Sequence, residues 1–403
     1  MNNNDMTYVS RFFSLVMFML MISLTAKADY SGSCGDNATY MFDPATSTLT
    51  ITGTGEMQDY SFYYTLTYGY TTNAPWARYK DEIKHIIIDT GITHIGNHAY
   101  HQCFNLSSVT ISTSVISIGD FAFSECNTLS SILIPKSVKA IGSSAFAKCN
   151  NLLSIDSSDF NDDLYIKASA FDNTAWFDSQ TDGLVYIGKI LYRYKGFMPY
   201  NTSLIIKDST LRIGEEAFRN CTGLSSIDLP NSLMYIDERS FYGCSSLSTI
   251  DIPNNVKSIG NEAFKKCSNI ATLKIPDNTT TIGDYAFEDC NSINSVTLGK
   301  GINSVGYHAF SGCNGILSVT ILCPTIGDWF SGNHFIEEII LGDGVTAIGE
   351  KAFSGCTALS SIIIPNSVTL IDRQAFENCA SLTSVTIPNS ITSLGNRAFH
   401  DCI

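Results

Sequence analysis

The chain has 403 residues, of which 44% are hydrophobic and only 15% are charged, with 38 Asp and Glu against 24 Lys and Arg. This composition supplies ample apolar material for a folded core and excludes an intrinsically disordered chain. The net charge of −14 repels phosphate backbones and anionic membrane surfaces, so nucleic acid is not an expected partner.

Residues 1–28 have the pattern of a secretory signal peptide. Arg11 precedes the apolar run from Phe12 to Leu24, and a small-residue A-K-A motif ends at Ala28. The run is about a dozen residues long, shorter than the roughly 20 that a helix needs to cross a bilayer, so cleavage before Asp29 is favoured over an uncleaved anchor. We therefore expect a secreted or cell-surface protein with no membrane insertion after signal cleavage.

Residues 29–82 carry hairpin signals and lack the repeat that follows them. Alternating segments at 38–42 and 48–52 flank a turn at Asp43 and Pro44. We expect an N-terminal β-rich cap, because without one the first strand of the repeat array would expose an unpaired edge and half a core.

From residue 83 onward, a repeat of 23 residues dominates the sequence. An aromatic residue recurs three positions before a cysteine, and most neighbouring cysteines are 23 residues apart. Self-similarity at this period indicates a stack of equivalent turns. Eleven of the 13 cysteines occupy this slot, namely Cys103, Cys126, Cys149, Cys221, Cys244, Cys267, Cys290, Cys313, Cys356, Cys379 and Cys402.

The unit at 359–379 shows the pattern clearly. Leu359, Ile362 and Ile364 have the L-x-x-L-x-L spacing of a leucine-rich repeat, and the last two point to the same side of a short strand. Pro365 ends that strand, because proline cannot donate a ladder hydrogen bond.

The second half of the same unit contains Ala375, Phe376 and Cys379. Their spacing predicts a single helical turn with Ala375 and Cys379 on one face. A lone turn has too little apolar surface to offset its ordering entropy, so neighbouring turns must stack around one core. Residues 83–403 are thus predicted to form a leucine-rich-repeat solenoid, α/β to mainly β, with about thirteen 23-residue turns and a parallel sheet on one face.

Two regions depart from the regular repeat. The interval between Phe171 and Phe218 is 47 residues, and residues 172–203 alternate like a β-hairpin, so we expect a modified repeat whose strands protrude from the stack. A short interval of 20 residues ends at Phe330, after which Asn333 takes the cysteine slot. The sequence stops in mid-repeat, which indicates either a truncated gene product or a partner on the uncapped C-terminal end, possible self-association included.

These repeats resemble the BspA-like leucine-rich-repeat proteins, whose units read I-P-x-S-V-x-x-I-G-x-x-A-F-x-x-C-x-x-L. The unit from Ile364 to Leu382 matches except that Asp372 replaces the glycine, and the segments at 32–57 and 176–199 also resemble parts of that family. The resemblance implies secreted or cell-surface microbial proteins that adhere to host matrix proteins or to other cells. The chain lacks a C-terminal sorting motif, so the resemblance leaves its mode of surface attachment open.

Residue patterns for catalysis or metal binding are weak. His94, His98 and His101 have a spacing that could hold a metal on one helix, but the chain is expected to turn between them. The sequence contains no C-x-x-C pair and no G-x-S-x-G elbow. We therefore predict no catalytic residue, no metal and no cofactor. The repeated cysteines are expected to be small buried hydrophobes, and the states of Cys34 and Cys323 are left open.

The candidate ligand-binding residues fall into two groups. Tyrosine and arginine are favoured in interface hot spots, which makes the aromatic and basic insert a candidate contact patch. Short hydroxyl and carboxylate side chains beside the predicted strands could engage a protein strand or a glycan, although solvent-facing strands carry such residues for solubility alone. The candidates are Tyr186, Lys189, Tyr192, Arg193 and Tyr194 in the insert, and Ser226, Asp228, Thr249 and Asp251 on the strands.

The sequence thus predicts a non-enzymatic, secreted or cell-surface repeat protein for protein–protein recognition or adhesion. Its expected partner is an extracellular protein or glycan, such as a host matrix protein or another cell. The alternative is a structural, self-assembling surface array component without a specific ligand.

Overall fold

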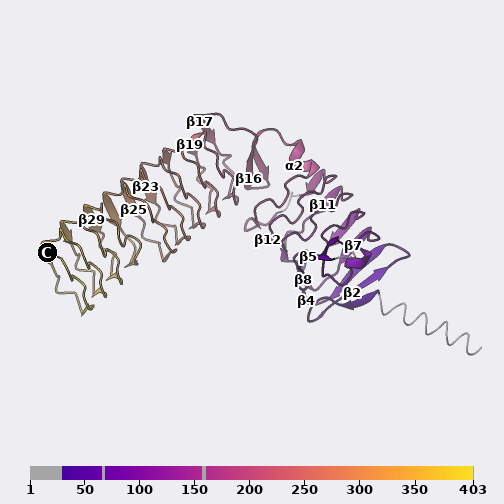
Figure 1. Ribbon diagram of the computed structural model, residues 1–403, viewed down its shortest axis with the longest axis horizontal. Helices are drawn as coiled ribbons and strands as arrows, with labels where there is room; N and C mark the ends of the chain where they lie inside the picture. Colours follow the sequence, from indigo (N-terminus) through magenta and orange to yellow (C-terminus); the bar gives the residue numbers. More distant parts are fainter. Residues whose placement is uncertain (1–29, 66–68, 157–159, 403) are drawn as a thin grey trace, which may run out of the picture. The chain divides into compact units, whose positions relative to one another are not determined.

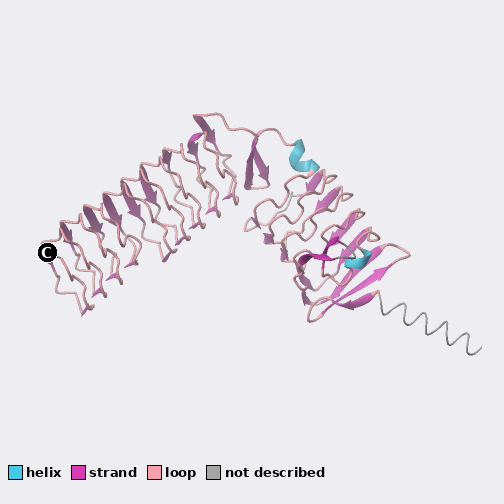
Figure 2. Ribbon diagram, viewed as in Figure 1, coloured by secondary structure: helices cyan, strands magenta, loops and turns pink. Residues whose placement is uncertain are grey.

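The computed structural model describes residues 30–65, 69–156 and 160–402, so the signal peptide predicted at 1–28 lies outside the described residues. The chain forms two compact units, Met1–Gln180 and Thr181–Ile403. Both units consist of stacked turns of short strands, and the described helical segments are few and short, as Figure 2 shows. The predicted solenoid of about thirteen turns with parallel sheets is confirmed.

The first unit contains an antiparallel cap that continues into the stacked turns (Figure 1). Its elements are β1 (Ser31–Ser33), β2 (Ala38–Asp43), β3 (Thr48–Gly53), β4 (Gly55–Glu56), β5 (Phe62–Thr65), β6 (Gly69–Thr72), the 3-10 helix η1 (Ala77–Tyr79), β7 (His85–Ile88), β8 (Ile92–Ile95), β9 (Ser108–Ile111), β10 (Ser117–Ile118), β11 (Ser131–Leu133), β12 (Ala140–Ile141), β13 (Ser154–Asp156), β14 (Tyr165–Ile166) and α2 (Ala175–Ser179). The expected hairpin appears as β2 and β3, and β3 pairs in parallel with β7. The cap thereby covers the strand edge that the first turn would otherwise expose.

The second unit contains a series of longer strands and a series of shorter strands, which pair mainly in parallel and are divided into three and two separate sheets. Its elements are β15 (Gly183–Ile187), β16 (Ile190–Lys195), β17 (Thr202–Ile205), β18 (Arg212–Ile213), β19 (Leu224–Asp228), β20 (Tyr235–Ile236), β21 (Thr249–Ile250), β22 (Ser258–Ile259), β23 (Thr272–Ile275), β24 (Thr281–Ile282), β25 (Ser295–Leu298), β26 (Ser304–Val305), β27 (Ser318–Ile321), β28 (Thr325–Ile326), β29 (Glu338–Leu341), β30 (Ala347–Ile348), β31 (Ser361–Ile363), β32 (Leu370–Ile371), β33 (Ser384–Thr386) and β34 (Ser393–Leu394). Figure 1 shows the longer strands β19, β23, β25 and β29 following one another along the stack.

The insert forms the predicted hairpin, since β15 and β16 pair antiparallel. The expectation that its strands protrude from the stack is wrong for β16. This strand pairs in parallel with β18 and opens the ladder of shorter strands. The hairpin therefore belongs to the body of the second unit, and one of its faces packs on the core.

The repeated phenylalanines form runs of stacked rings within each unit, and most of these rings are buried. Phe264 is fully buried, and its ring centroid lies 5.0 Å from that of Phe241 and 5.2 Å from that of Phe287, with interplanar angles of 4° and 3°. Buried isoleucine, leucine and valine side chains of the strands complete a single apolar cluster through the second unit. Each turn thus covers the apolar face of its neighbour, as the repeat period predicts.

The single helical turn predicted at Ala375–Cys379 is wrong. Gln374 and Asn378 lie in the left-handed region, with φ angles of 58° and 62°. With these two residues in the left-handed region, the N–H groups of Gln374, Phe376 and Asn378 donate to carbonyls of the next turn. The N–H groups of Ala375, Glu377 and Cys379 donate instead to carbonyls three residues earlier in the chain. The motif is therefore a second inter-turn ladder. The i, i+1, i+4 spacing fits a helix equally well, which is why sequence spacing alone could not distinguish the two.

The cysteine slot is explained by a shared carbonyl. The carbonyl oxygen of Phe241 accepts the backbone N–H of Cys244 at 3.1 Å and the thiol of Cys267, in the next turn, at 3.1 Å. The same thiol contact recurs along the stack, for example from Cys290 to Phe264. All 13 cysteines are free thiols, and Cys34 and Cys323 are buried as well. The ladder cysteines act as small core residues that also satisfy a backbone acceptor.

Candidate binding surface

The outward side chains of the longer strands in the second unit form two parallel rows. Strand pairing and the repeat spacing align the members of each row on successive strands. Inward neighbours such as Val296 and Val319 are buried, so the rows alternate with core positions. Row A comprises Ser203, Ser226, Thr249, Thr272, Ser295, Ser318, Glu338, Ser361 and Ser384, and row B comprises Ile205, Asp228, Asp251, Lys274, Thr297, Thr320, Ile340, Ile363 and Thr386.

The predicted strand residues lie together on these rows. Ser226 on β19 pairs with Thr249 on β21, and the Ser226 hydroxyl donates to the Ser203 hydroxyl at 2.7 Å. Asp228 and Asp251 are both exposed in row B. These four candidates form one polar, acidic segment of the surface.

The predicted insert residues do not form one exposed patch. Tyr192 is only 3% exposed, and Tyr186 and Tyr194 are partly buried against the apolar cluster. The Tyr186 hydroxyl accepts the backbone N–H of Lys207 at 3.3 Å, which fixes the ring beside the turn of the hairpin. Of these candidates Lys189 is exposed, whereas the Arg193 guanidinium lies 5.6 Å from the ring centroid of Tyr192. Most of the aromatic surface that made the insert attractive is therefore used in packing.

Sequence reasoning missed two exposed aromatic residues in the C-terminal part of the insert and an exposed isoleucine just after it. Phe197, Tyr200 and Ile205 are 80%, 78% and 77% exposed. Phe197 and Tyr200 lie in the loop between β16 and β17, where Gly196 and Pro199 mark irregular backbone. Aromatic residues within such a loop have no strand face to pack on, and this signal could have identified them.

Two exposed isoleucines on row B were also missed. Ile340 is 48% exposed and Ile363 is 86% exposed, although most other members of the row are polar. Both occur in runs of consecutive isoleucines, and strand alternation must send one member of such a run to solvent. The runs were visible in the sequence, but their outward members were not singled out as candidate binding residues.

A shallow groove of about 860 Å³ lies at these isoleucines, between β29 and β31. Strand pairing is interrupted between the two strands: one sheet ends with β29 and another begins with β31. Glu337, Glu338 and Asp343 line the groove. Among the described residues none of these three carboxylates forms an ion pair, so the groove combines an apolar floor with negative charge.

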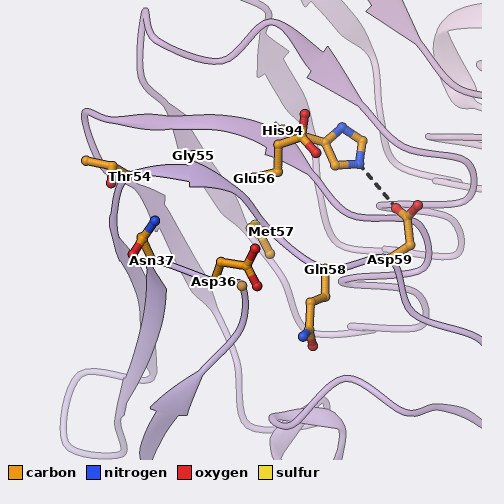
Figure 3. Close-up of a pocket in the computed structure, with 10 residues that line it drawn as sticks. Asp36, Asn37, Thr54, Gly55, Glu56, Met57, Gln58, Asp59 and His94 are labelled. Carbon is orange, nitrogen blue, oxygen red and sulfur yellow. Dashed lines mark hydrogen bonds and ion pairs between the residues drawn. The ribbon is translucent and has the colours of Figure 1, made fainter.

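The first unit carries a separate, acidic pocket of about 610 Å³, where the cap meets β8 (Figure 3). Asp36, Glu56 and Asp59 contribute carboxylates, and His94 lies 3.2 Å from Asp59 and 2.8 Å from the hydroxyl of Ser117. Within the described ranges no group of three or more His, Cys, Asp and Glu side chains is arranged to hold a metal. His94 is thus engaged in local polar contacts.

The other two histidines of the motif lie in an aromatic cluster of the first unit. The His98 ring is stacked between those of Phe62 and Phe121, with centroid distances of 5.9 and 4.9 Å. His101 is 5% exposed and touches Phe62 edge to face at 4.4 Å. Burial lowers the pKa of His101 to about 4, against a smaller opposing effect of Glu125. His101 is therefore a neutral core side chain near pH 7.

The repeats decide the family. The model of the BspA type leucine rich repeat region matches six copies, over residues 77–184, 185–317 and 325–403. This chain belongs to the BspA-type leucine-rich-repeat family. No curated protein matches it.

Several solved structures are similar to this BspA-type protein. A leucine-rich repeat protein from Bacteroides ovatus is 25% identical over 92% of each chain, with a TM-score of 0.44. One from Eubacterium ventriosum is 20% identical over 93% of this chain and 95% of that chain, with a TM-score of 0.32. A leucine rich cell surface protein from Faecalibacterium prausnitzii is 22% identical over 92% of each chain, with a TM-score of 0.29.

The repeated positions of the BspA-type motif supply the core. Its repeated isoleucine, alanine, phenylalanine and cysteine positions are buried in turn after turn. Of the outward positions, row B varies between turns, whereas row A is serine or threonine except at Glu338. In the part of the chain that the structure describes, no helix is long and apolar enough to span a bilayer.

Proposed function

We propose that this protein is secreted or held at the cell surface, and that it recognises an extracellular protein through the outward rows of its sheets. The observation that carries the proposal is that each turn has two kinds of position: the repeated apolar positions build a packed core, while the hydroxyl positions of row A and the varying positions of row B face solvent on the longer strands. A surface held in place by a packed core loses little conformational entropy on binding.

Recognition is supported over catalysis by the chemistry of the outward rows. Short hydroxyl side chains alternate there with a few carboxylates, one lysine and exposed isoleucines. Such a surface offers hydrogen bonds and apolar contact but no arrangement of nucleophile and base. We therefore propose a non-enzymatic role in adhesion to a host matrix protein or to another cell.

A binding screen tests this function. Residues 29–403 are immobilised and exposed to extracellular matrix proteins, glycans and intact cells. The expected result is saturable binding to a protein that falls at least several-fold when Thr249 and Thr272, both exposed in row A, are replaced by arginine. The matched control replaces Thr280 and Asn303, exposed residues beside the shorter strands, by arginine and leaves binding unchanged.

Three outcomes contradict the proposal. If the arginine substitutions at Thr249 and Thr272 and those at Thr280 and Asn303 reduce binding equally, the outward rows have no special role in binding. Binding confined to glycans changes the class of partner. Concentration-dependent association of the chain in sedimentation, without any binding to other proteins, supports the self-assembling array instead.

A further inference from the structure

The groove between β29 and β31 lies at one of the two places where pairing of the longer strands in the second unit is interrupted, the other being between β21 and β23. The longer strands from β23 to β29 pair continuously, and pairing resumes between β31 and β33. At the interruption the surface is hollowed to about 860 Å³, and the hollow is lined along both strands. A segment laid along β29 would have about four residues of strand to follow, which at roughly 3.3 Å per residue is about 13 Å.

The floor of this groove is apolar where solvation would favour a polar side chain. Ile340 on β29 and Ile363 on β31 are neighbours in row B, and Ile363 is 86% exposed. Each isoleucine that leaves water contributes a favourable free energy in proportion to its apolar area. The two side chains together offer a contact point for one aliphatic side chain of a partner.

The rim of the groove carries one sign of charge. Glu338 lies in row A, two residues before Ile340 and therefore on the same outward face of β29. Glu337 precedes it, and Asp343 lies beyond the end of the strand. No lysine or arginine lines the groove. Carboxylates placed at both ends of an apolar floor attract a partner with basic groups at matching positions.

We propose that this groove docks an extended, basic segment of a partner protein, with an aliphatic side chain flanked two positions away on each side by lysine or arginine. The spacing follows from the strand period, because residues i, i+2 and i+4 of an extended segment face the same way. The aliphatic side chain then contacts Ile340 and Ile363, and the basic groups approach Glu338 and Asp343. This inference rests on the proposed function and names the chemistry of its partner.

Two other occupants are disfavoured by the same observations. A second copy of this chain carries a net charge of −14, so its approach to an acidic groove is opposed by electrostatic repulsion. A nucleic acid is repelled for the same reason. The exposed isoleucines favour a partner that brings apolar side chains of its own.

The test uses residues 29–403 and blocked peptides in which a K-T-V-T-K core is compared with K-T-S-T-K and E-T-V-T-E. The first peptide is expected to bind saturably, and the other two to bind at least about tenfold more weakly, a change of about 1.4 kcal/mol. Raising the salt concentration should weaken the binding, because the flanking charges are screened.

Substitutions in the chain locate the site. Ile363→Ser and Glu338→Gln should each reduce affinity for K-T-V-T-K by about tenfold, which is about 1.4 kcal/mol. Both side chains face solvent, so the urea midpoint should not change. The matched control is Ile205→Ser, at a row B isoleucine of similar exposure on β17, which should leave the affinity unchanged.

Several results would overturn the assignment: no saturable binding at millimolar peptide, equal binding of the charge-reversed peptide, or equal loss of affinity in Ile205→Ser. Dimerisation that is abolished by Ile363→Ser would make a second copy the occupant. If a protein found in the screen binds Ile363→Ser and Glu338→Gln normally, the groove assignment fails while the proposed function stands. If the peptide binds the groove but no protein binds the chain, the proposed function fails alone.

Discussion

Removal of one ring from the phenylalanine stack should destabilise the second unit strongly. Phe264 is fully buried and contacts a ring on each side, at centroid distances of 5.0 and 5.2 Å. Truncation of a buried phenylalanine to alanine costs about 3 to 5 kcal/mol, because apolar contact is lost and a cavity remains. Two aromatic pairs are broken, each contributing about 0.5 to 1.5 kcal/mol, so Phe264→Ala is expected in the upper half of that range.

Urea unfolding followed by far-ultraviolet circular dichroism measures this effect. The midpoint should fall while the slope with urea stays constant. Phe264→Leu serves as the control, because it keeps most of the buried volume, loses only the ring contacts and should cost about 1.5 kcal/mol. A loss below about 1 kcal/mol for the alanine variant would be typical of a surface position and would refute the stacked core.

Three further predictions concern other buried groups. Burial raises the pKa values of Cys103 and Cys379 to about 12, so iodoacetamide should label these two thiols only after denaturation, which mass spectrometry can show. Rapid labelling of Cys103 in the folded chain would contradict its burial. The pKa of His101 is about 4 in the folded chain, against an ordinary value of 6.5. As the pH falls, the unfolded chain therefore binds a proton on His101 before the folded chain does, and the free energy of unfolding should decrease by about 3 kcal/mol between pH 6.5 and pH 4. This decrease should be smaller in His101→Phe, and identical urea midpoints of the wild-type chain at the two pH values would argue against a buried neutral imidazole. Tyr192→Ala should lower the urea midpoint through a loss of about 3 kcal/mol, whereas Lys189→Ala should leave it unchanged; an unaltered midpoint for Tyr192→Ala would place that ring at the surface after all.

The repeat period predicted the fold well because it records directly which positions must pack. Leu359, Ile362 and Ile364 are all buried, as are Phe376 and Cys379. The backbone between them was not predicted, since left-handed residues at Gln374 and Asn378 leave no clear trace in residue type. Their conformation is fixed by hydrogen bonds to the next turn, which local spacing does not describe.

The binding surface was predicted only in part, for two different reasons. The outward placement of Asp228 and Asp251 follows from strand alternation alone. The burial of Tyr192 depends on the pairing of β16 with β18, a contact between segments that are distant in sequence. The groove at Ile363 likewise requires knowledge of where strand pairing stops. The aromatic and basic composition of the insert suggested a contact patch, but the pairing of β16 with β18 determines which of its side chains are exposed to solvent.

Wherever a phenylalanine carbonyl accepts both a backbone N–H and the thiol of the next turn, consecutive turns are joined by the same set of hydrogen bonds. Duplication or deletion of one whole 23-residue repeat would leave every remaining contact between turns with its full set of hydrogen-bond donors and acceptors. The array can therefore change length without changes to its core residues. An insertion or deletion of any other length requires a local change of side chains that restores the hydrogen bonds between turns. The shortened turn shows such a change, since Asn333 stands in the thiol position and its side-chain amide donates to the carbonyl of Cys313 at 3.2 Å.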